Sequence, residues 1–100
     1  MSSPQEIRAV AENAVVVFSK SWCPYSKKAK DLLKTHYPEV QPAIYELDEK
    51  EDGGKAYQDY LEGKTGQRTV PNIFIRQQHI GGSSHLVALH DEDGIRALLK

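Results

Sequence analysis

Residues 15–18 are three valines followed by a phenylalanine, and this run constrains the fold more than any other part of the chain. A β-branched and aromatic segment without polar alternation is typical of a short strand that is buried on both faces. Such a strand lies inside a sheet whose two faces are both covered by other parts of the chain. The chain has 100 residues, which is a single-domain length, so we expect one domain over residues 1–100.

Apolar residues at helical spacing predict four helices elsewhere in the chain. They lie near 4–12, from Pro24 to just before Pro38, around 56–61 with an end near Gly63 or Gly66, and over 86–99 with an interruption near 90–91. The first begins with Ser3-Pro4-Gln5-Glu6, which is typical of a capping box with proline at the first helical position. One face of the second helix should carry Ala29, Leu32, Leu33 and His36.

Three further strands are predicted between these helices. Residues 42–48 alternate with Ala43, Tyr45 and Leu47 on one side, and residues 72–75 and 78–80 are close enough to form a hairpin. Strands separated by helices should pair in parallel through right-handed crossovers, and the hairpin should add antiparallel strands. The expected fold class is therefore α/β, with a four-stranded mixed sheet, helices on both faces and a thioredoxin-like architecture.

Charge and composition exclude several classes of protein. Thirteen Lys and Arg against fourteen Asp and Glu give a formal net charge of −1, which argues against a dedicated nucleic-acid binder. The longest purely apolar run, 14–18, is far shorter than the roughly 20 residues that span a bilayer. A single cysteine can form no internal disulfide and no zinc site built from several thiolates. With no signal peptide evident, we expect a cytoplasmic or similarly reducing location.

The single cysteine, Cys23, lies at the predicted turn from the first strand to the second helix. The unpaired N–H groups and the dipole of a helix N-terminus favour a thiolate and lower thiol pKa values to about 3.5–7.5. Four nearby lysines should strengthen this effect: Lys20, Lys27, Lys28 and Lys30. We therefore interpret Cys23 as a reactive cysteine rather than as a small buried apolar residue. A Cys–His hydrolase is the competing chemistry, although none of the histidines (36, 79, 85 and 90) shares a local hydrolase signature with Cys23.

Two other segments suit ligand binding. Pro71 follows residues 66–70 and precedes a predicted strand, so it is either an ordinary first-strand proline or a cis-proline. A cis bond would turn the backbone of Val70 toward Cys23, where it could pair with an extended peptide. The segment Gly81-Gly82-Ser83-Ser84 is either a plain strand-to-helix turn with a serine N-cap or a set of N–H groups that accepts an anionic ligand.

Three motifs in this order and spacing resemble those of glutaredoxins, and the resemblance covers nearly the whole chain: Cys23-Pro24-Tyr25, Thr69-Val70-Pro71, and Gly81-Gly82 before the last helix. It implies a glutathione-dependent thiol-disulfide oxidoreductase with no metal site, in which Cys23 is the nucleophile. The resemblance also implies the residues that bind glutathione. Lys20, Gln58 and Arg68 would face its glycine carboxylate, and Tyr25 would pack beside the tripeptide. Val70, in the turn formed by Thr69 and a cis-Pro71, would pair with its cysteinyl backbone, and Gly82, Ser83 and Ser84 would hold its γ-glutamyl carboxylate.

The chain departs from the glutaredoxin pattern at two positions. Ser26 stands where dithiol glutaredoxins have a second catalytic cysteine, and it is either native or an engineered replacement. His85 stands where the family usually has an aspartate that pairs with the γ-glutamyl ammonium, which puts that contact in doubt. Without a second thiol the expected reaction is monothiol deglutathionylation of proteins or small mixed disulfides, and a second glutathione regenerates Cys23. Glutathione reductase would then act indirectly, and we expect a monomer.

Two other functions stay open. Some glutaredoxins with a Cys-x-x-Ser site resemble this chain and hold a [2Fe–2S] cluster between two protomers, with one cysteine from each and two glutathiones as ligands. Pro24 argues against this, because the family's cluster binders often have a more flexible residue there. The third possibility is a partner-binding scaffold without redox turnover. A brown colour would indicate the cluster, and a Cys23→Ser variant with unchanged activity would indicate the scaffold.

Overall fold

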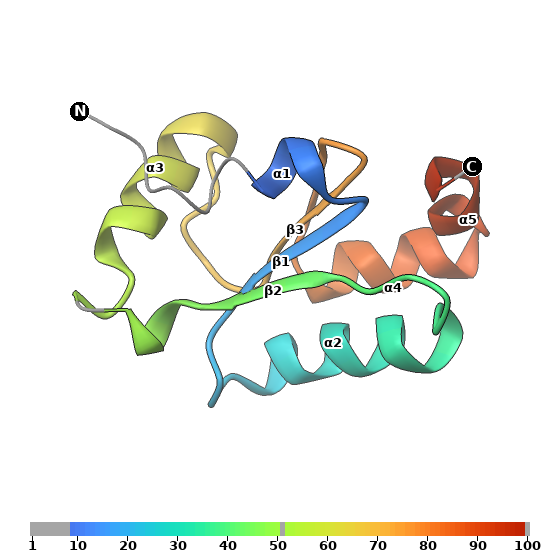
Figure 1. Cartoon of the computed structure of the whole chain (residues 1–100), viewed down its shortest axis with the longest axis horizontal. Helices are drawn as coiled ribbons and strands as arrows, with labels where there is room; N and C mark the ends of the chain where they lie inside the picture. Colours follow the sequence, from blue (N-terminus) through green and yellow to red (C-terminus); the bar gives the residue numbers. More distant parts are fainter. Residues whose placement is uncertain (1–8, 51, 100) are drawn as a thin grey trace.

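The computed structural model describes residues 9–50 and 52–99, and its helices and strands follow the predicted order closely (Figure 1). The elements are α1 (Ala9–Glu12), β1 (Val15–Ser19), α2 (Pro24–His36), β2 (Ala43–Glu46), the 3₁₀-helix η2 (Leu47–Glu49), α3 (Lys55–Thr65), β3 (Asn72–Ile75), β4 (Gln78–Gly81), α4 (Ser83–Asp91) and α5 (Gly94–Leu99). Only the last turn of the predicted first helix is described, and the predicted capping box at Ser3 lies outside the described residues. In the described part of the chain no helix is long and apolar enough to cross a membrane.

The four strands form one mixed sheet in the order β2-β1-β3-β4. β1 pairs with β2 in parallel, and β3 and β4 form the predicted antiparallel hairpin. The sequence-based expectation for β3 is wrong, because β3 is separated from β2 by α3 and yet runs antiparallel to β1.

The reason is visible in the register. Glu46, the last residue of β2, lies beside Ser19, and Asn72, the first residue of β3, lies beside Phe18. The chain therefore leaves β2 and enters β3 at the same end of the sheet, and β3 must run back. Since β2 and β3 lie on opposite sides of β1, α3 does not form the crossover that joins two parallel neighbours.

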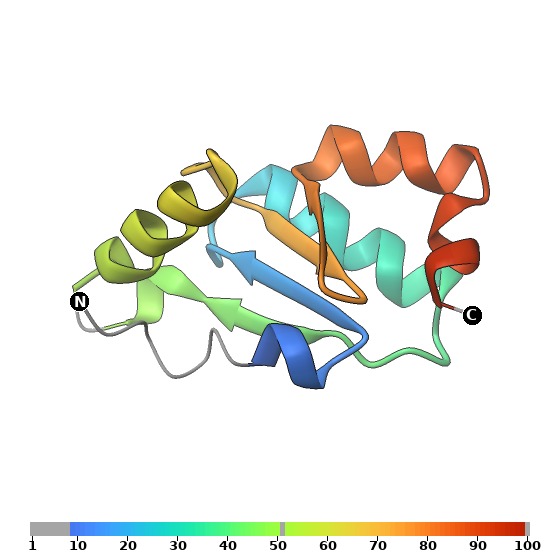
Figure 2. The same ribbon diagram turned by 90° about the horizontal axis from the view of Figure 1, so that it is seen from above.

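Helices cover both faces of the sheet, as predicted, and the two faces bury separate apolar clusters (Figure 2). All five residues of β1 are buried, and alternate residues point to opposite clusters. The first cluster contains Val15 and Val17 of β1 and packs against α2, α4 and α5 through Ala29, Leu33, Leu86 and Ile95. The second contains Val16 and Phe18 and packs against α1, η2 and α3 through Val10, Leu47, Tyr57 and Leu61.

Three local details differ from the sequence-based prediction. His36 at the end of α2 is exposed, and the next residue, Tyr37, is buried in its place. The hairpin turn contains no glycine, yet Arg76 and Gln77 both have positive φ values, 49° and 70°, as a two-residue hairpin turn requires. The C-terminal helix is interrupted slightly later than predicted, between Asp91 and Gly94.

Candidate functional site

Cys23 is the N-cap residue of α2, and Pro24 is the first residue of that helix. The preceding turn is closed by a hydrogen bond from the N–H of Cys23 to the carbonyl of Lys20, at 3.0 Å. The carbonyl of Cys23 in turn accepts the N–H of Lys27 at 3.0 Å, the first hydrogen bond of the helix. Cys23 therefore lies at the predicted position, at the start of α2, where the N–H groups of the first turn have no partner within the helix. Only 7% of the residue is exposed.

The surroundings of Cys23 favour its thiolate. Burial raises the pKa of the thiol, but hydrogen bonds from the backbone and hydroxyl of Ser26, a hydrogen bond from the backbone of Tyr25 and the charge of Lys20 lower it by more. The pKa of Cys23 therefore lies below its usual value. A thiolate is the nucleophilic form of cysteine, so this geometry suits attack on a disulfide sulfur.

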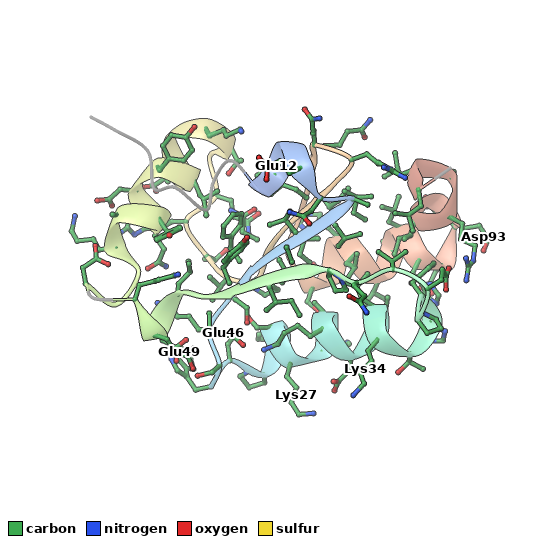
Figure 3. All side chains as sticks on the ribbon, in the orientation of Figure 1. Glu12, Lys27, Lys34, Glu46, Glu49 and Asp93 are labelled. Atoms are coloured by element: carbon green, nitrogen blue, oxygen red, sulfur yellow. The ribbon has the colours of Figure 1, made fainter. Side chains whose placement is uncertain are left out.

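The predicted contribution of the other lysines needs correction. Lys20 is the lysine whose charge lowers the pKa of Cys23. Lys27 points away from the body of the molecule (Figure 3) and forms an ion pair with Asp31 at 2.9 Å. Lys30 forms an ion pair with Glu46 at the end of β2, at 2.8 Å. Lys20 therefore lowers the pKa of the thiol, while Lys27 and Lys30 are each engaged with a carboxylate.

Ser26 is fully buried and forms hydrogen bonds to the thiol of Cys23. Its Oγ accepts a hydrogen bond from the N–H of Lys20 at 3.4 Å, so the same hydroxyl contacts both the turn and Cys23. Ser26 can stabilise a thiolate, but it cannot form a disulfide with it.

The Val70–Pro71 peptide bond is cis, which selects the second of the two sequence-based interpretations. The carbonyl oxygen of Val70 lies 3.9 Å from Sγ of Cys23. Sequence reasoning missed Gln67, whose side-chain amide donates to the carbonyls of Thr69 and Pro71, at 3.0 Å each. No local pattern marks this residue, because its partners are backbone atoms of a turn that only the folded chain forms.

Of the three residues expected to bind the glycine carboxylate, Gln58 and Arg68 lie together on α3 and the loop after it, whereas Lys20 lies in the turn before α2. The side-chain amide of Gln58 donates to the carbonyl of Arg68 at 3.0 Å. The guanidinium of Arg68 is paired with Asp59 at 2.5 Å and lies 3.5 Å from Glu62. In this structure Gln58 thus supports the backbone of Arg68, and two carboxylates of α3 hold the guanidinium.

The start of α4 lies beside the cis-proline turn. A Cβ atom on Gly82 would lie 3.6 Å from the carbonyl oxygen of Pro71, so the two backbones are in contact distance. The N-cap is Gly82, so the interpretation of a serine N-cap is wrong. Ser83 is the first helical residue and is only 6% exposed, and its hydroxyl has no hydrogen-bond partner among the described residues. Ser84 and His85 are exposed.

His85 takes over the capping of this helix. Its Nδ1 accepts the N–H of Gly82 at 3.2 Å. The imidazole lies so close to Gly81 that a Cβ atom there would be 2.7 Å from Nδ1, and Gly81 also has a φ of +116°. Both facts require glycine at this position. Backbone geometry and close packing against His85 therefore explain the first glycine of the motif, Gly81.

Two aromatic residues flank Cys23 in the sequence. Tyr25 is 67% exposed and Trp22 is 68% exposed, so both are open to a bound molecule. The ammonium of Lys20 lies 5.9 Å from the centre of the Trp22 ring, a cation–π distance. Tyr25 was predicted as a binding residue, and Trp22 was not. In the described part of the chain, no group of three or more His, Cys, Asp and Glu residues is placed to hold a metal ion.

The mixed sheet, the low-pKa cysteine at the start of α2 and the adjacent cis-proline define a thioredoxin-like protein with a reactive-thiol site. A family model described as Glutaredoxin matches residues 15–80. The chain is 49% identical over 92 residues to Glutaredoxin-1 of Rhizophagus irregularis. This match covers 92% of this chain and 88% of the relative. The chain belongs to the glutaredoxin family, whose members are glutathione-using thiol oxidoreductases.

Other relatives are longer or of known structure. The chain is 48% identical to the chloroplastic monothiol glutaredoxin-S12 of Arabidopsis thaliana; the match covers 90% of this chain and about half, 49%, of that protein. The crystal structure of a buckwheat glutaredoxin–glutathione complex matches with a TM-score of 0.84 and 38% identity, covering 95% of this chain and 84% of the other. The holo form of glutaredoxin C1 from Populus tremula x tremuloides matches with a TM-score of 0.83 and 37% identity, covering 92% and 88% of the two chains.

Proposed function

We propose that this chain catalyses monothiol deglutathionylation, with Cys23 as the nucleophile and glutathione as the reductant. The observation that carries the proposal is the pairing of Cys23 with Ser26. The pKa of Cys23 is lowered, so the thiol is prepared for attack, and the buried neighbour that contacts it is a hydroxyl. The chain has no other cysteine, so it cannot resolve a disulfide internally.

The reaction proceeds in two thiol–disulfide exchanges. In the first, the Cys23 thiolate attacks the glutathione sulfur of a mixed disulfide; a bond from Cys23 to glutathione forms, and the substrate leaves as a thiolate. In the second, the thiolate of another glutathione attacks the bound glutathione sulfur. Cys23 is released as a thiolate and oxidised glutathione forms. In the net reaction one mixed disulfide and one glutathione give one substrate thiol and one oxidised glutathione: the S–S bond between substrate and glutathione breaks, and an S–S bond between two glutathiones forms.

Glutathione is an extended tripeptide with a carboxylate at each end, and the site offers partners of matching chemistry. We infer that Val70 pairs with its cysteinyl backbone, because the Val70 carbonyl lies beside Cys23. Gly82, Ser83 and Ser84 would hold the γ-glutamyl carboxylate at the start of α4, where the buried Ser83 hydroxyl has no described partner. Lys20, Gln58 and Arg68 would hold the glycine carboxylate. The buckwheat neighbour solved in complex with glutathione supports glutathione as the ligand.

The test is glutathione-dependent turnover of a small glutathione mixed disulfide, with oxidised glutathione followed through glutathione reductase. Turnover should be lost in Cys23→Ser. A matched control is Thr35→Ala, because Thr35 is an exposed hydroxyl residue at the end of α2 opposite to Cys23. Turnover that survives in Cys23→Ser would contradict the proposal.

The second candidate function is that of a [2Fe–2S] carrier, and the same purified protein can be used to test it. One chain supplies a single thiolate, so a four-thiolate cluster would need a second protomer and two glutathiones. Visible absorbance of the purified protein in the presence of glutathione, without turnover, would replace the enzymatic proposal by this one.

A further inference from the structure

The carboxylate of Asp48 connects the turn before Cys23 to the segment that follows the edge strand β2. Asp48 lies in η2, directly after β2, and both of its oxygens accept hydrogen bonds from Ser21. Oδ1 is 3.0 Å from the backbone nitrogen of Ser21, and Oδ2 is 2.5 Å from its hydroxyl. The two residues are 27 positions apart in the sequence. The reaction proposed above assigns no role to either residue.

Asp48 is itself held firmly. The preceding residue, Leu47, is fully buried in the cluster beneath α3, and its carbonyl accepts the N–H of Lys50 at 3.1 Å, which closes η2. One residue earlier, Glu46 pairs with Lys30 of α2. The backbone of Asp48 is thus fixed by the buried Leu47 and the ion pair of Glu46 before it, and by the hydrogen bond of Lys50 after it. A carboxylate on such an anchor can hold a loop in place.

The turn held by Asp48 carries the groups that set the chemistry of the thiol. Ser21 lies between Lys20 and Cys23 in a turn that the Cys23 N–H closes onto the Lys20 carbonyl. The N–H of Lys20 also donates to the hydroxyl of Ser26. A shift of Ser21 therefore moves Lys20, and with it both the charge beside the thiol and a hydrogen bond of Ser26.

We propose that Asp48 is a positioning residue for Cys23: through its two hydrogen bonds to Ser21 it holds the turn of residues 20–23 in the geometry that stabilises the thiolate. The inference rests on the proposed function only in taking Cys23 as the reacting nucleophile.

The direction in which the Cys23 thiolate fraction changes when Asp48 is removed distinguishes an effect of its hydrogen bonds from an effect of its charge. A negative charge near a thiol favours the protonated form. Hydrogen bonds from the hydroxyl and then the N–H of Ser21 hold the pKa of Asp48 below its usual value, so it is ionised at neutral pH. If Asp48 acted by its charge, its removal would increase the thiolate fraction. If it acts by position, its removal decreases that fraction.

The experiment measures the rate of alkylation of Cys23 by iodoacetamide against pH in the full chain, for wild type, Asp48→Ala, Asp48→Asn and Ser21→Ala. We expect Asp48→Ala to reduce the thiolate fraction at neutral pH by about threefold to tenfold. Asp48→Asn, which keeps an acceptor for the Ser21 N–H, and Ser21→Ala, which keeps the backbone hydrogen bond, should show smaller decreases. At alkaline pH, where every thiol is ionised, the four rates should agree.

Asp52→Asn is the matched control. Asp52 also accepts two N–H groups through its two oxygens, from Gly54 at 3.0 Å and Ala56 at 2.9 Å, but it holds the start of α3. Its loss should lower thermal stability and leave the alkylation profile unchanged. Equal alkylation profiles for wild type, Asp48→Ala and Ser21→Ala, or a larger thiolate fraction in the variants, would overturn the proposal.

Ser21→Ala decides the matter if Asp48→Ala does not fold, because it removes one exposed hydroxyl; an unchanged profile would then overturn the proposal. The readout requires no glutathione. A wild-type chain that fails to turn over mixed disulfides would therefore defeat the proposed function, while the profiles would still judge Asp48.

Discussion

The sulfur of Cys23 and the carbonyl oxygen of Val70 lie 3.9 Å apart, although 47 residues separate them in the sequence. The contact joins the start of α2 to the cis-proline turn before β3, and it places a backbone acceptor beside the nucleophile. A thiol can donate weakly to this oxygen, whereas a thiolate cannot. Ionisation of Cys23 therefore frees the carbonyl of Val70 at the moment when an incoming peptide needs it.

The ionisation of Cys23 should also appear in the stability of the fold. The pKa of Cys23 is lowered in the folded chain, mainly by Ser26 against the opposing effect of burial. The folded state thus binds its proton less tightly than the unfolded state does, so the contribution of Cys23 to stability is fully present above the unfolded pKa. It is lost as the pH falls through the folded pKa. We expect urea unfolding across this range to show that the free energy of unfolding of wild type, relative to that of Cys23→Ser, increases as the pH rises.

In that comparison the variant is also the control, because both chains share every other titrating group. A stability difference that is flat with pH would contradict the lowered pKa.

The hydroxyl of Ser26 should have a measurable effect on the thiol. Ser26→Ala removes a hydrogen bond that lowers the pKa of Cys23, so alkylation at neutral pH should slow, by roughly threefold or more. Ser26→Cys should instead add reduction of protein disulfides, because a second thiol can resolve the mixed disulfide. Insulin reduction measures this gain. A Ser26→Cys chain that stays inactive on protein disulfides would show that the buried position cannot resolve.

Arg68 should affect glutathione binding more than folding. Its guanidinium is paired with Asp59 on the surface, and such pairs contribute little to stability. Arg68→Ala should therefore raise the KM for glutathione about threefold to tenfold, with kcat and the thermal midpoint nearly unchanged.

Arg96→Ala is the control for Arg68→Ala, since Arg96 forms a similar surface pair, with Glu39 at 2.6 Å, among residues that contact neither Cys23 nor the cis-proline turn. A KM for glutathione that rises equally in both variants, or in neither, would remove Arg68 from the site.

The cluster between the sheet and α2 should dominate the stability of the fold. Leu33 is only 1% exposed and packs in the cluster with Val17 and Leu86. Leu33→Ala should lower the free energy of unfolding by about 2–5 kcal/mol, because it leaves a cavity in a packed core. Lys34→Ala, on the exposed face of the same helix, is the control and should change little. Urea unfolding compares the two, and equal losses would contradict the assigned core.

The sequence predicted well what local patterns encode. The run over 15–18 marked β1, and Pro24 and Pro38 bracketed α2 because each restricts the backbone near it. The direction of β3 could not be read from the strand and helix order, because it depends on which side of β1 the chain returns. The two-residue turn at Arg76 carries no glycine, so its shape comes from the strands that it joins.

The candidate site was predictable to the same extent. The place of Cys23 follows from the strand-to-helix turn, and the motif resemblance drew attention to Pro71 and Gly82. The side chains that organise these segments were invisible, because Gln67 and Asp48 act through hydrogen bonds to backbone that only folding brings near. Their residue types are common on any surface, and neither lies in a motif.

The serine at position 26 also determines how long a mixed disulfide on Cys23 lasts. Because this buried neighbour has no sulfur, any bond from Cys23 to another sulfur persists until a thiol molecule arrives from solution. The lifetime of that adduct is then governed by a second-order encounter, so it depends on the concentration of external thiol rather than on motion within the chain. Desalting into thiol-free buffer should therefore preserve the adduct unchanged for as long as the protein stays folded, and adding thiol should discharge it in proportion to the amount added.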